Sequence, residues 1–205
     1  MLNVEWNNLG KRFGLNWVFR KLEGNIPSGS HVVVIGSNGS GKSTFGKLLV
    51  GATEPTDGDM RWLNNGEEVE IDNIPQRIAW SAPFMEVPED MTMVEVLDFH
   101  STFRKSWSEG YLNELLISSG LENHSDAKVR TLSSGQKQRL RLILAMGTEA
   151  ELVVLDEPCS NLDSSGIKWY GEELKKLVSK TTVVVCSNNR PEESLEGASE
   201  ILLGA

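Results

Sequence analysis

The sequence predicts an α/β fold with a mainly parallel sheet, an N-terminal antiparallel β-subdomain and a helical insert at about residues 84–131. Two observations predict this class. Strand-like and helix-like segments alternate through the chain outside the insert, an order that favours parallel pairing with right-handed crossovers. In addition, an apolar run at 32–35 leads through a glycine-rich loop straight into a helix-like segment at 43–50. We expect one domain over residues 1–205, a length sufficient for one sizeable core.

The N-terminal part is expected to supply short strands. Two of them fall at 2–6 and 18–22, and a Pro-Ser-Gly turn at 27–29 separates them from the glycine-rich unit. A further edge strand is expected at 68–71, and a short buried strand at 78–81.

The insert differs in character from the rest and indicates two helices. Thr92 with Glu95 forms a capping box at the start of the first helix. The second is expected at 109–119 and ends at Gly120. The apolar face expected for the first helix consists of Val96, Phe99, Phe103 and Trp107.

The last third of the chain alternates helices with strands. Helices are expected at 136–146 and 165–178, and strands at 152–155 and 181–186. The second of these helices carries an apolar stripe with helical spacing, formed by Ile167, Tyr170, Leu174 and Leu177.

The glycine-rich loop at 36–43, GSNGSGKS, fits the phosphate-loop pattern of glycine, four residues, glycine, lysine and serine. Its glycines let backbone N–H groups curl around a polyphosphate, and the helix N-terminus adds donors and partial positive charge. Lys42 can reach the β- and γ-phosphates, and the Ser43 hydroxyl can ligate Mg²⁺. A glycine turn that merely precedes a helix is the alternative, which two further motifs make negligible. The residues expected to hold the phosphates are Ser37, Asn38, Gly39, Ser40, Gly41, Lys42, Ser43 and Thr44.

The apolar run at 152–155 ends in two acids, Asp156 and Glu157. Ligands of open α/β sheets bind at the carboxyl ends of the strands, so both acids are expected near the phosphates. Asp156 would hold Mg²⁺ directly or through water, and Glu157 would polarise the attacking water. The alternative is a strand that simply ends in a polar turn.

A third motif, LSSGQ at 132–136, is a serine-glycine turn that opens a basic helix. A helix N-terminus of this kind can bind an anion. By itself, however, the segment is better explained as a helix cap.

In this order and spacing, the three motifs resemble the ATP-binding cassette (ABC) ATPases, the nucleotide-binding subunits of ABC transporters, over essentially the whole chain. The resemblance implies a P-loop NTPase fold with ATP and Mg²⁺ as cofactors. Residues 132–136 are similar to the family's signature sequence, and 160–163 to its D-loop. Phe13 matches the aromatic residue that stacks on adenine, with core packing as the alternative role and Trp17 as the competing residue.

In that family two cassettes dimerise head to tail, so that the signature of one covers the ATP bound by the other. The resemblance implies that Ser133 and Gly135 contact the γ-phosphate of a partner's ATP, with Gln136 and Asp163 in the same nucleotide-binding set. ATP then holds the dimer together, and integral membrane subunits (the permease) convert its closure and release into transport. The second cassette can be identical or different. The expected location is cytoplasmic, peripheral on the inner face of the cell membrane.

The chain departs from the family pattern at two positions. Pro83 stands where the family has a glutamine, and proline cannot ligate Mg²⁺ or hold a water. Asn188 stands where the family has a histidine; its amide can donate to a γ-phosphate oxygen but carries no charge. With Glu157, Lys42 and Asn188 as the catalytic residues, we expect hydrolysis slowed by about 10²–10³ rather than abolished. The alternative is a non-hydrolysing ATP-binding subunit that regulates a complex.

Composition narrows the class of partner. The formal net charge of −9 argues against nucleic-acid binding, which needs a basic face, and thus against the soluble ABC proteins of DNA repair or translation. No apolar run approaches the ~18–20 residues needed to span a bilayer, and the N-terminus lacks the features of a secretory signal. Cys159 and Cys186 give no disulfide framework, which favours a reducing cytoplasm.

Two further expectations concern cargo and docking. The run at 163–166 and the compact length are modestly similar to the ATPase of the haem exporter in cytochrome c maturation, and the lack of an appended regulatory domain favours export. The apolar residues that follow position 83 form either a docking patch for the membrane subunit or part of the packing under the insert. They are Phe84, Met85, Val87 and Met91.

Overall fold

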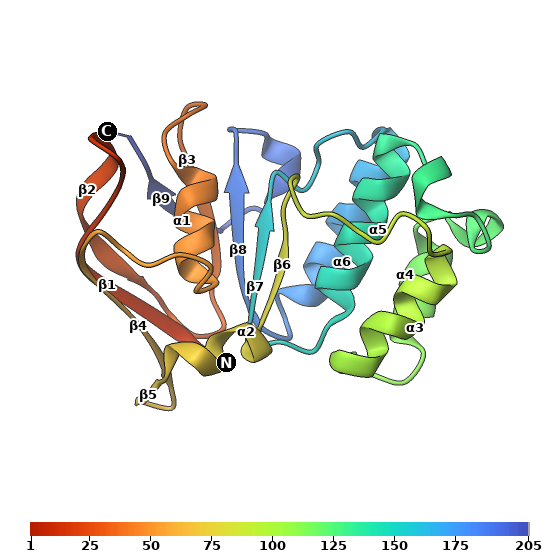
Figure 1. Ribbon diagram of the computed structural model, residues 1–205, viewed down its shortest axis with the longest axis horizontal. Helices are drawn as coiled ribbons and strands as arrows, with labels where there is room; N and C mark the ends of the chain where they lie inside the picture. Colours follow the sequence, from red (N-terminus) through yellow and green to blue (C-terminus); the bar gives the residue numbers. More distant parts are fainter. Residues whose placement is uncertain (205) are drawn as a thin grey trace.

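The computed structural model describes residues 1–204 and contains two β-sheets flanked by helices (Figure 1). The larger sheet has five parallel strands in the order β6-β7-β8-β3-β9. The central strands β7 and β8 are buried along their whole length, which is why they appear in the sequence as short apolar runs. The prediction of a mainly parallel sheet is confirmed. Its strands are β3 (His31–Ile35), β6 (Ile78–Ser81), β7 (Leu152–Asp156), β8 (Thr182–Ser187) and β9 (Ser199–Leu202).

The second sheet is antiparallel, with the order β2-β1-β4-β5, and forms the expected N-terminal β-subdomain. Two of its strands are 11 residues long, more than twice the predicted length. Bulges let β1 continue past the positions where the alternation of buried and exposed residues is interrupted. The edge strand predicted at 68–71 is shifted to 67–69. The strands are β1 (Asn3–Phe13), β2 (Asn16–Ile26), β4 (Asp57–Asn64) and β5 (Glu67–Val69).

The two faces of the parallel sheet support separate cores. On one face, alternate residues such as Val154 and Val184 pack with helix α1 (Lys42–Leu49), which lies between the two sheets (Figure 1). On the other face, Val153 and Val185 pack under the remaining long helices. These are α5 (Ser134–Gly147) and α6 (Ser164–Leu177), with α3 (Met93–Phe103) and α4 (Tyr111–Ser118) of the insert outside them.

Short helical turns complete the chain. The segment that connects β5 to β6 contains η1 (Ile71–Asn73) and α2 (Ile74–Arg77). The insert ends in η2 (Glu122–His124) and η3 (Val129–Thr131), and η4 (Pro191–Glu193) follows β8.

The start of the insert is as predicted, but its buried face is predicted only in part. The Thr92 hydroxyl accepts from Glu95 N–H at 3.2 Å, and the Glu95 carboxylate accepts from Thr92 N–H at 2.7 Å, so the capping box is confirmed. Phe99 and Phe103, however, are 50% and 70% exposed and stack edge-on against each other. The face that α3 buries consists of Met93, Val96 and Leu97, so Val96 is the one α3 residue of the predicted face that is buried.

Trp107 lies beyond the end of α3, where it is half-buried and packs on the core under the insert. Its indole Nε1 donates to the Met146 carbonyl at 2.9 Å, which ties the inter-helix connection to the end of α5. The stripe predicted for α6 is confirmed, since Tyr170, Leu174 and Leu177 are buried and Ile167 is half-buried. Within residues 1–204, none of the helices has the length and apolar character that crossing a membrane requires.

Candidate nucleotide-binding site

The loops that follow β3, β7 and β8 meet the end of the β1–β2 hairpin around a pocket of about 510 Å³. The pocket brings together most of the phosphate-loop residues, the second strand-end acid and the residue at the predicted histidine position. Its lining consists of Phe13, Val18, Asn38, Gly39, Gly41, Lys42, Ser43, Thr44, Glu157 and Asn188. Two predicted phosphate contacts, Ser37 and Ser40, are not in this lining, and Ser40 is buried; the predicted metal ligand Asp156 is not in the lining either.

The phosphate loop owes its shape to Gly41, which precedes α1 with a φ of 101°. A Cβ at this position would stand 2.4 Å from the Val18 side chain, so only glycine fits. No side chain among the described residues caps α1. The first N–H groups of the helix are therefore available to an anion, in the arrangement that the sequence predicts.

Lys42 is folded back over its own loop and is only 5% exposed. Its Nζ donates to the Gly36 carbonyl at 2.8 Å and to the Ser37 carbonyl at 3.0 Å. An ammonium group has three donors, so one N–H is left for a phosphate oxygen at the pocket.

Asp156 is 1% exposed, and neither of its carboxylate oxygens has a hydrogen-bond partner within residues 1–204. Burial raises the pKa of this carboxyl group, and the nearby Ser43 hydroxyl opposes that shift. A buried carboxylate without partners next to a hydroxyl is a donor set that suits Mg²⁺. Within the same range no cluster of three or more histidine, cysteine or acidic residues is found, so phosphate and water oxygens would have to complete the coordination.

Glu157 lies at the pocket with a left-handed backbone, φ 46°, and its N–H donates to the Cys186 carbonyl at 2.9 Å. The Asn188 amide Nδ2 donates to Glu157 Oε1 at 2.7 Å. Asn188 therefore holds the candidate water-activating carboxylate, a contact that sequence analysis does not predict. Pro83, at the predicted glutamine position, is exposed and does not line the pocket.

The aromatic candidates are separated by their positions. Phe13 lines the pocket and is 57% exposed, so the alternative of core packing is excluded. Trp17 does not line the pocket; the guanidinium groups of Arg12 and Arg20 lie 5.5 and 4.3 Å from the centroid of its ring. The geometry favours Phe13 for stacking on a base.

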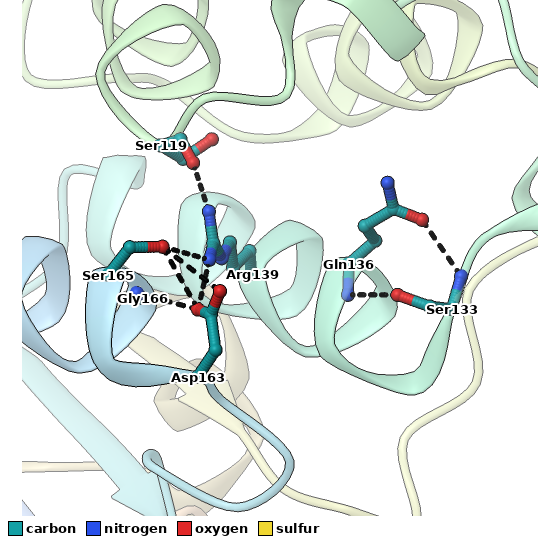
Figure 2. Close-up of polar contacts among 7 residues, drawn as sticks. All are labelled: Ser119, Ser133, Gln136, Arg139, Asp163, Ser165 and Gly166. Carbon is teal, nitrogen blue, oxygen red and sulfur yellow. Dashed lines mark hydrogen bonds and ion pairs between the residues drawn. The ribbon is translucent and has the colours of Figure 1, made fainter.

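The signature and D-loop residues lie on a different part of the molecule, at the starts of α5 and α6 (Figure 2). Ser133 caps α5 and forms a capping box with Gln136, as the helix-cap interpretation predicts. Gly135 packs so closely on the D-loop that a Cβ would lie 2.7 Å from the Asn161 carbonyl. Asp163 caps α6 by accepting from Gly166 N–H at 2.9 Å.

None of Ser133, Gly135, Gln136 and Asp163 lines the pocket of the same chain. Sequence analysis misses Arg139, which lies on α5 and joins this helix to Asp163 at the start of α6 (Figure 2). Its guanidinium pairs with Asp163 and donates to Ser165 Oγ at 2.8 Å. It lies three residues beyond the signature, and only its basic character was visible in the sequence.

A separate groove of about 380 Å³ lies between the parallel sheet and the insert, and Met85 and Val87 contribute to its lining. Val87 and Met91 also pack on the core under the insert. Phe84 is 49% exposed, stacks on Trp80 and lies 4.4 Å below the Lys47 ammonium. Val87 and Met91 thus pack under the insert, as one alternative predicts, whereas a docking role for Phe84 and Met85 stays a prediction.

Comparison with known proteins establishes the class of the chain. The family described as ABC transporter matches residues 19–160, about two thirds of the sequence. The chain belongs to this family.

Its curated relatives include proteins named for import and for export. The probable sulfate/thiosulfate import ATP-binding protein CysA of Chlorella vulgaris is 31% identical, over 98% of this chain and 87% of its own length. The Nod factor export ATP-binding protein I of Burkholderia lata is 30% identical over 93% of this chain, which spans 64% of it. The cytochrome c biogenesis ATP-binding export protein CcmA of Escherichia coli is 28% identical, over 85% and 83% of the two chains. Several relatives are longer, and the chain spans 53% to 64% of their length.

Among solved structures, a dimeric ATP-binding cassette in a post-hydrolysis state with ADP and Pi superposes with a TM-score of 0.81. It is 23% identical, over 98% of this chain and 94% of that one. At this identity the likeness confirms the fold, a P-loop cassette with a parallel sheet, an antiparallel subdomain and helices.

Proposed function

We propose that this chain is the ATP-binding and hydrolysing subunit of an ABC transporter. One observation carries the proposal: a single pocket joins an open helix N-terminus with Lys42, Ser43 and the Glu157–Asn188 pair. Asp156, whose buried carboxylate lacks a partner among the described residues, adjoins Ser43. Anion binding, cation binding and water activation thus occur side by side, as phosphoryl transfer to water requires.

Each residue has one step to perform. Phe13 stacks on the adenine ring, while the loop N–H groups and Lys42 hold the β- and γ-phosphates in place. Ser43 and Asp156 would hold Mg²⁺, which supplies charge neutralisation at the phosphate oxygens. Glu157 orients the attacking water and accepts its proton, and the Asn188 amide fixes Glu157 Oε1 for this purpose.

The signature and D-loop residues of this chain act on the ATP that a second cassette binds. Ser133, Gly135, Gln136 and Asp163 lie away from the pocket of their own chain, which supports their contacting the ATP of a partner in a head-to-tail dimer. The N-terminus of α5 then faces the γ-phosphate, and ATP closes the dimer. The partner cassette is a second copy or a different chain.

We further propose that the membrane subunit docks at the groove between the parallel sheet and the insert, with the chain on the cytoplasmic face of the membrane. Met85 and Val87 offer apolar surface there. Replacing Met85 with glutamate should abolish membrane recruitment, whereas the exposed Ile117 on α4, outside the groove, should tolerate the same change. Recruitment that survives the change at Met85 would rule out this docking face. Export remains a prediction, because relatives of both directions match the chain.

A second function is favoured by Pro83 and Asn188, which replace two polar residues expected from the family. A chain that binds ATP and dimerises without hydrolysis would regulate a complex. Retention of Glu157, with an amide partner already in place, supports hydrolysis as the main proposal.

The test uses a tagged Glu157→Gln chain, which should bind ATP and stay dimeric. Native membranes are incubated with this chain and MgATP, solubilised mildly and affinity-purified, and the same chain carrying Lys42→Ala serves as the control that lacks ATP. Copurification of an integral membrane protein with the first chain only is the expected result. Recovery of soluble proteins alone would overturn the transporter assignment.

A further inference from the structure

Glu193 is a buried carboxylate that no predicted motif contains. It ends η4 and is only 1% exposed. Its Oε2 accepts from the Ser187 hydroxyl at 2.6 Å, and its Oε1 accepts from Cys159 N–H at 3.3 Å. Glu193 does not line the nucleotide pocket, so it does not touch the substrate there.

The two partners of Glu193 belong to the two strand ends that carry the candidate catalytic pair. Ser187 is the last residue of β8 and immediately precedes Asn188. Cys159 follows Glu157 by two residues in the loop after β7. On the pocket side, Asn188 donates to Glu157 at 2.7 Å. Glu193 and the Asn188–Glu157 contact therefore join the same two loops at two separate points and close a ring.

Glu193 is itself firmly held. The hydroxyl of the fully buried Tyr170 donates to the Glu193 carbonyl at 2.8 Å, which anchors η4 to α6. Arg190 reinforces the ring, because its N–H donates to Ser187 Oγ at 3.2 Å and its Nη1 donates to the Cys159 carbonyl at 3.2 Å. The carboxylate thus has a fixed position from which to hold both loops.

We infer that Glu193 is a positioning residue for hydrolysis: by joining Ser187 to Cys159, it sets the separation of Asn188 and Glu157. The inference depends on the proposed roles of those two residues. Without the carboxylate, a buried hydroxyl and a buried N–H lose their acceptor, and the two loops are free to separate. Such a displacement affects the activated water rather than the bound nucleotide, since the phosphate loop takes no part in the ring.

Glu193→Gln is the sharpest substitution, because it keeps the shape and one acceptor oxygen. Its amide N–H₂ necessarily meets one of the two donors and breaks that side of the ring. The full chain should show kcat lower by about tenfold to 100-fold, with KM for MgATP changed less than about threefold. Glu173→Gln is the matched control: Glu173 is also a buried glutamate, at 4% exposure, but its carboxylate pairs with Lys176 away from the pocket. The kcat of the Glu173→Gln variant should stay at the wild-type value.

A double variant separates positioning from a general loss of packing. In an Asn188→Ala background the ring is already open, so adding Glu193→Gln should reduce kcat less than about threefold further. Full multiplication of the two effects, or a rise in KM with kcat unchanged, would overturn the inference. Glu157→Gln serves as the reference: if it lowers kcat and Glu193→Gln does not, this inference alone fails. If Glu157→Gln has no effect, the proposed hydrolytic site fails and this inference with it.

Discussion

The Asn188 side-chain amide donates to Glu157 Oε1 at 2.7 Å, across the ends of two adjacent parallel strands. An amide can hold a carboxylate in position, but it neither titrates nor carries charge at neutral pH. In the proposed site, therefore, the partner of the water-activating group provides orientation alone. The three histidines of the chain, His31, His100 and His124, do not line the pocket.

This arrangement predicts how hydrolysis depends on pH. The wild-type kcat should show no change that follows the ionisation of a histidine between about pH 6 and 7. Asn188→His should introduce such a change above the usual histidine pKa of about 6.5, because Glu157 favours the imidazolium; kcat should fall below that pH, since an imidazolium beside Glu157 weakens the carboxylate as a base. Steady-state turnover from pH 5.5 to 8.5 checks this, and superimposable profiles for the two proteins would contradict it.

Asp156 should weaken the fold in the absence of ligand. Burial raises the pKa of this carboxyl group in the folded state. Relative to the charged form, the protonated form therefore favours folding: this stability is fully present below the group's usual pKa near 3.8, and it is lost as pH rises through the folded-state pKa. At pH 7, Asp156→Asn should therefore raise Tm by roughly 2–4 °C for each ~1 kcal/mol relieved. The same variant should lose the additional Tm increase that Mg²⁺ gives over ATP alone. A lower Tm in the ligand-free variant would show that the carboxylate has stabilising partners.

Phe13 and Trp17 provide a matched pair of aromatic substitutions on one hairpin. Phe13→Ala should weaken ATP binding by about fivefold to 150-fold, because stacking of a base on an aromatic ring contributes ~1–3 kcal/mol. Trp17→Ala should leave the Kd within about twofold, since Trp17 lies outside the pocket lining. Titration with a fluorescent ATP analogue measures both, and the reverse order of effects would assign the stacking role to Trp17.

Ser133 allows its capping role to be separated from its proposed contact with ATP in trans. Ser133→Ala removes the cap of α5 and should lower the free energy of unfolding by about 1 kcal/mol. Ser133→Asp should keep the cap, since aspartate is equally favoured there, but place a negative charge against the partner's γ-phosphate. ATP-dependent dimerisation, followed by light scattering in a Glu157→Gln background, should persist for the alanine variant and disappear for the aspartate variant. Equal dimerisation would argue against the composite site.

Local patterns are what the sequence could predict. The phosphate loop, the acidic strand end and the helix caps each depend on residues within a few positions of one another, and the elements that carry them lie where they were expected. The strands that escaped prediction have weak local signals. β4 begins with Asp-Gly-Asp and turns only Met60 and Trp62 inward, and β9 pairs along one edge with β3 alone.

The contacts that organise the site connect residues far apart in the chain, and one sequence carries little information about such pairs. Asn188 meets Glu157 across 31 positions, and Glu193 meets Cys159 across 34. Arg139 reaches Asp163 across 24 positions. The error at Phe99 and Phe103 has the same origin: helical spacing identifies an apolar stripe, but only the position of the neighbouring helices decides which stripe is buried.

Steady-state ATP turnover of the full chain, compared with Glu157→Gln, tests the central claim most directly. The measurement is made with saturating MgATP, at a protein concentration where turnover per subunit no longer rises, so that dimerisation does not limit the rate. We predict slow but measurable hydrolysis by the wild-type chain and at least a tenfold lower rate for the variant, with ATP binding retained. Equal rates in the two proteins would contradict the assignment of Glu157 as the residue that activates water.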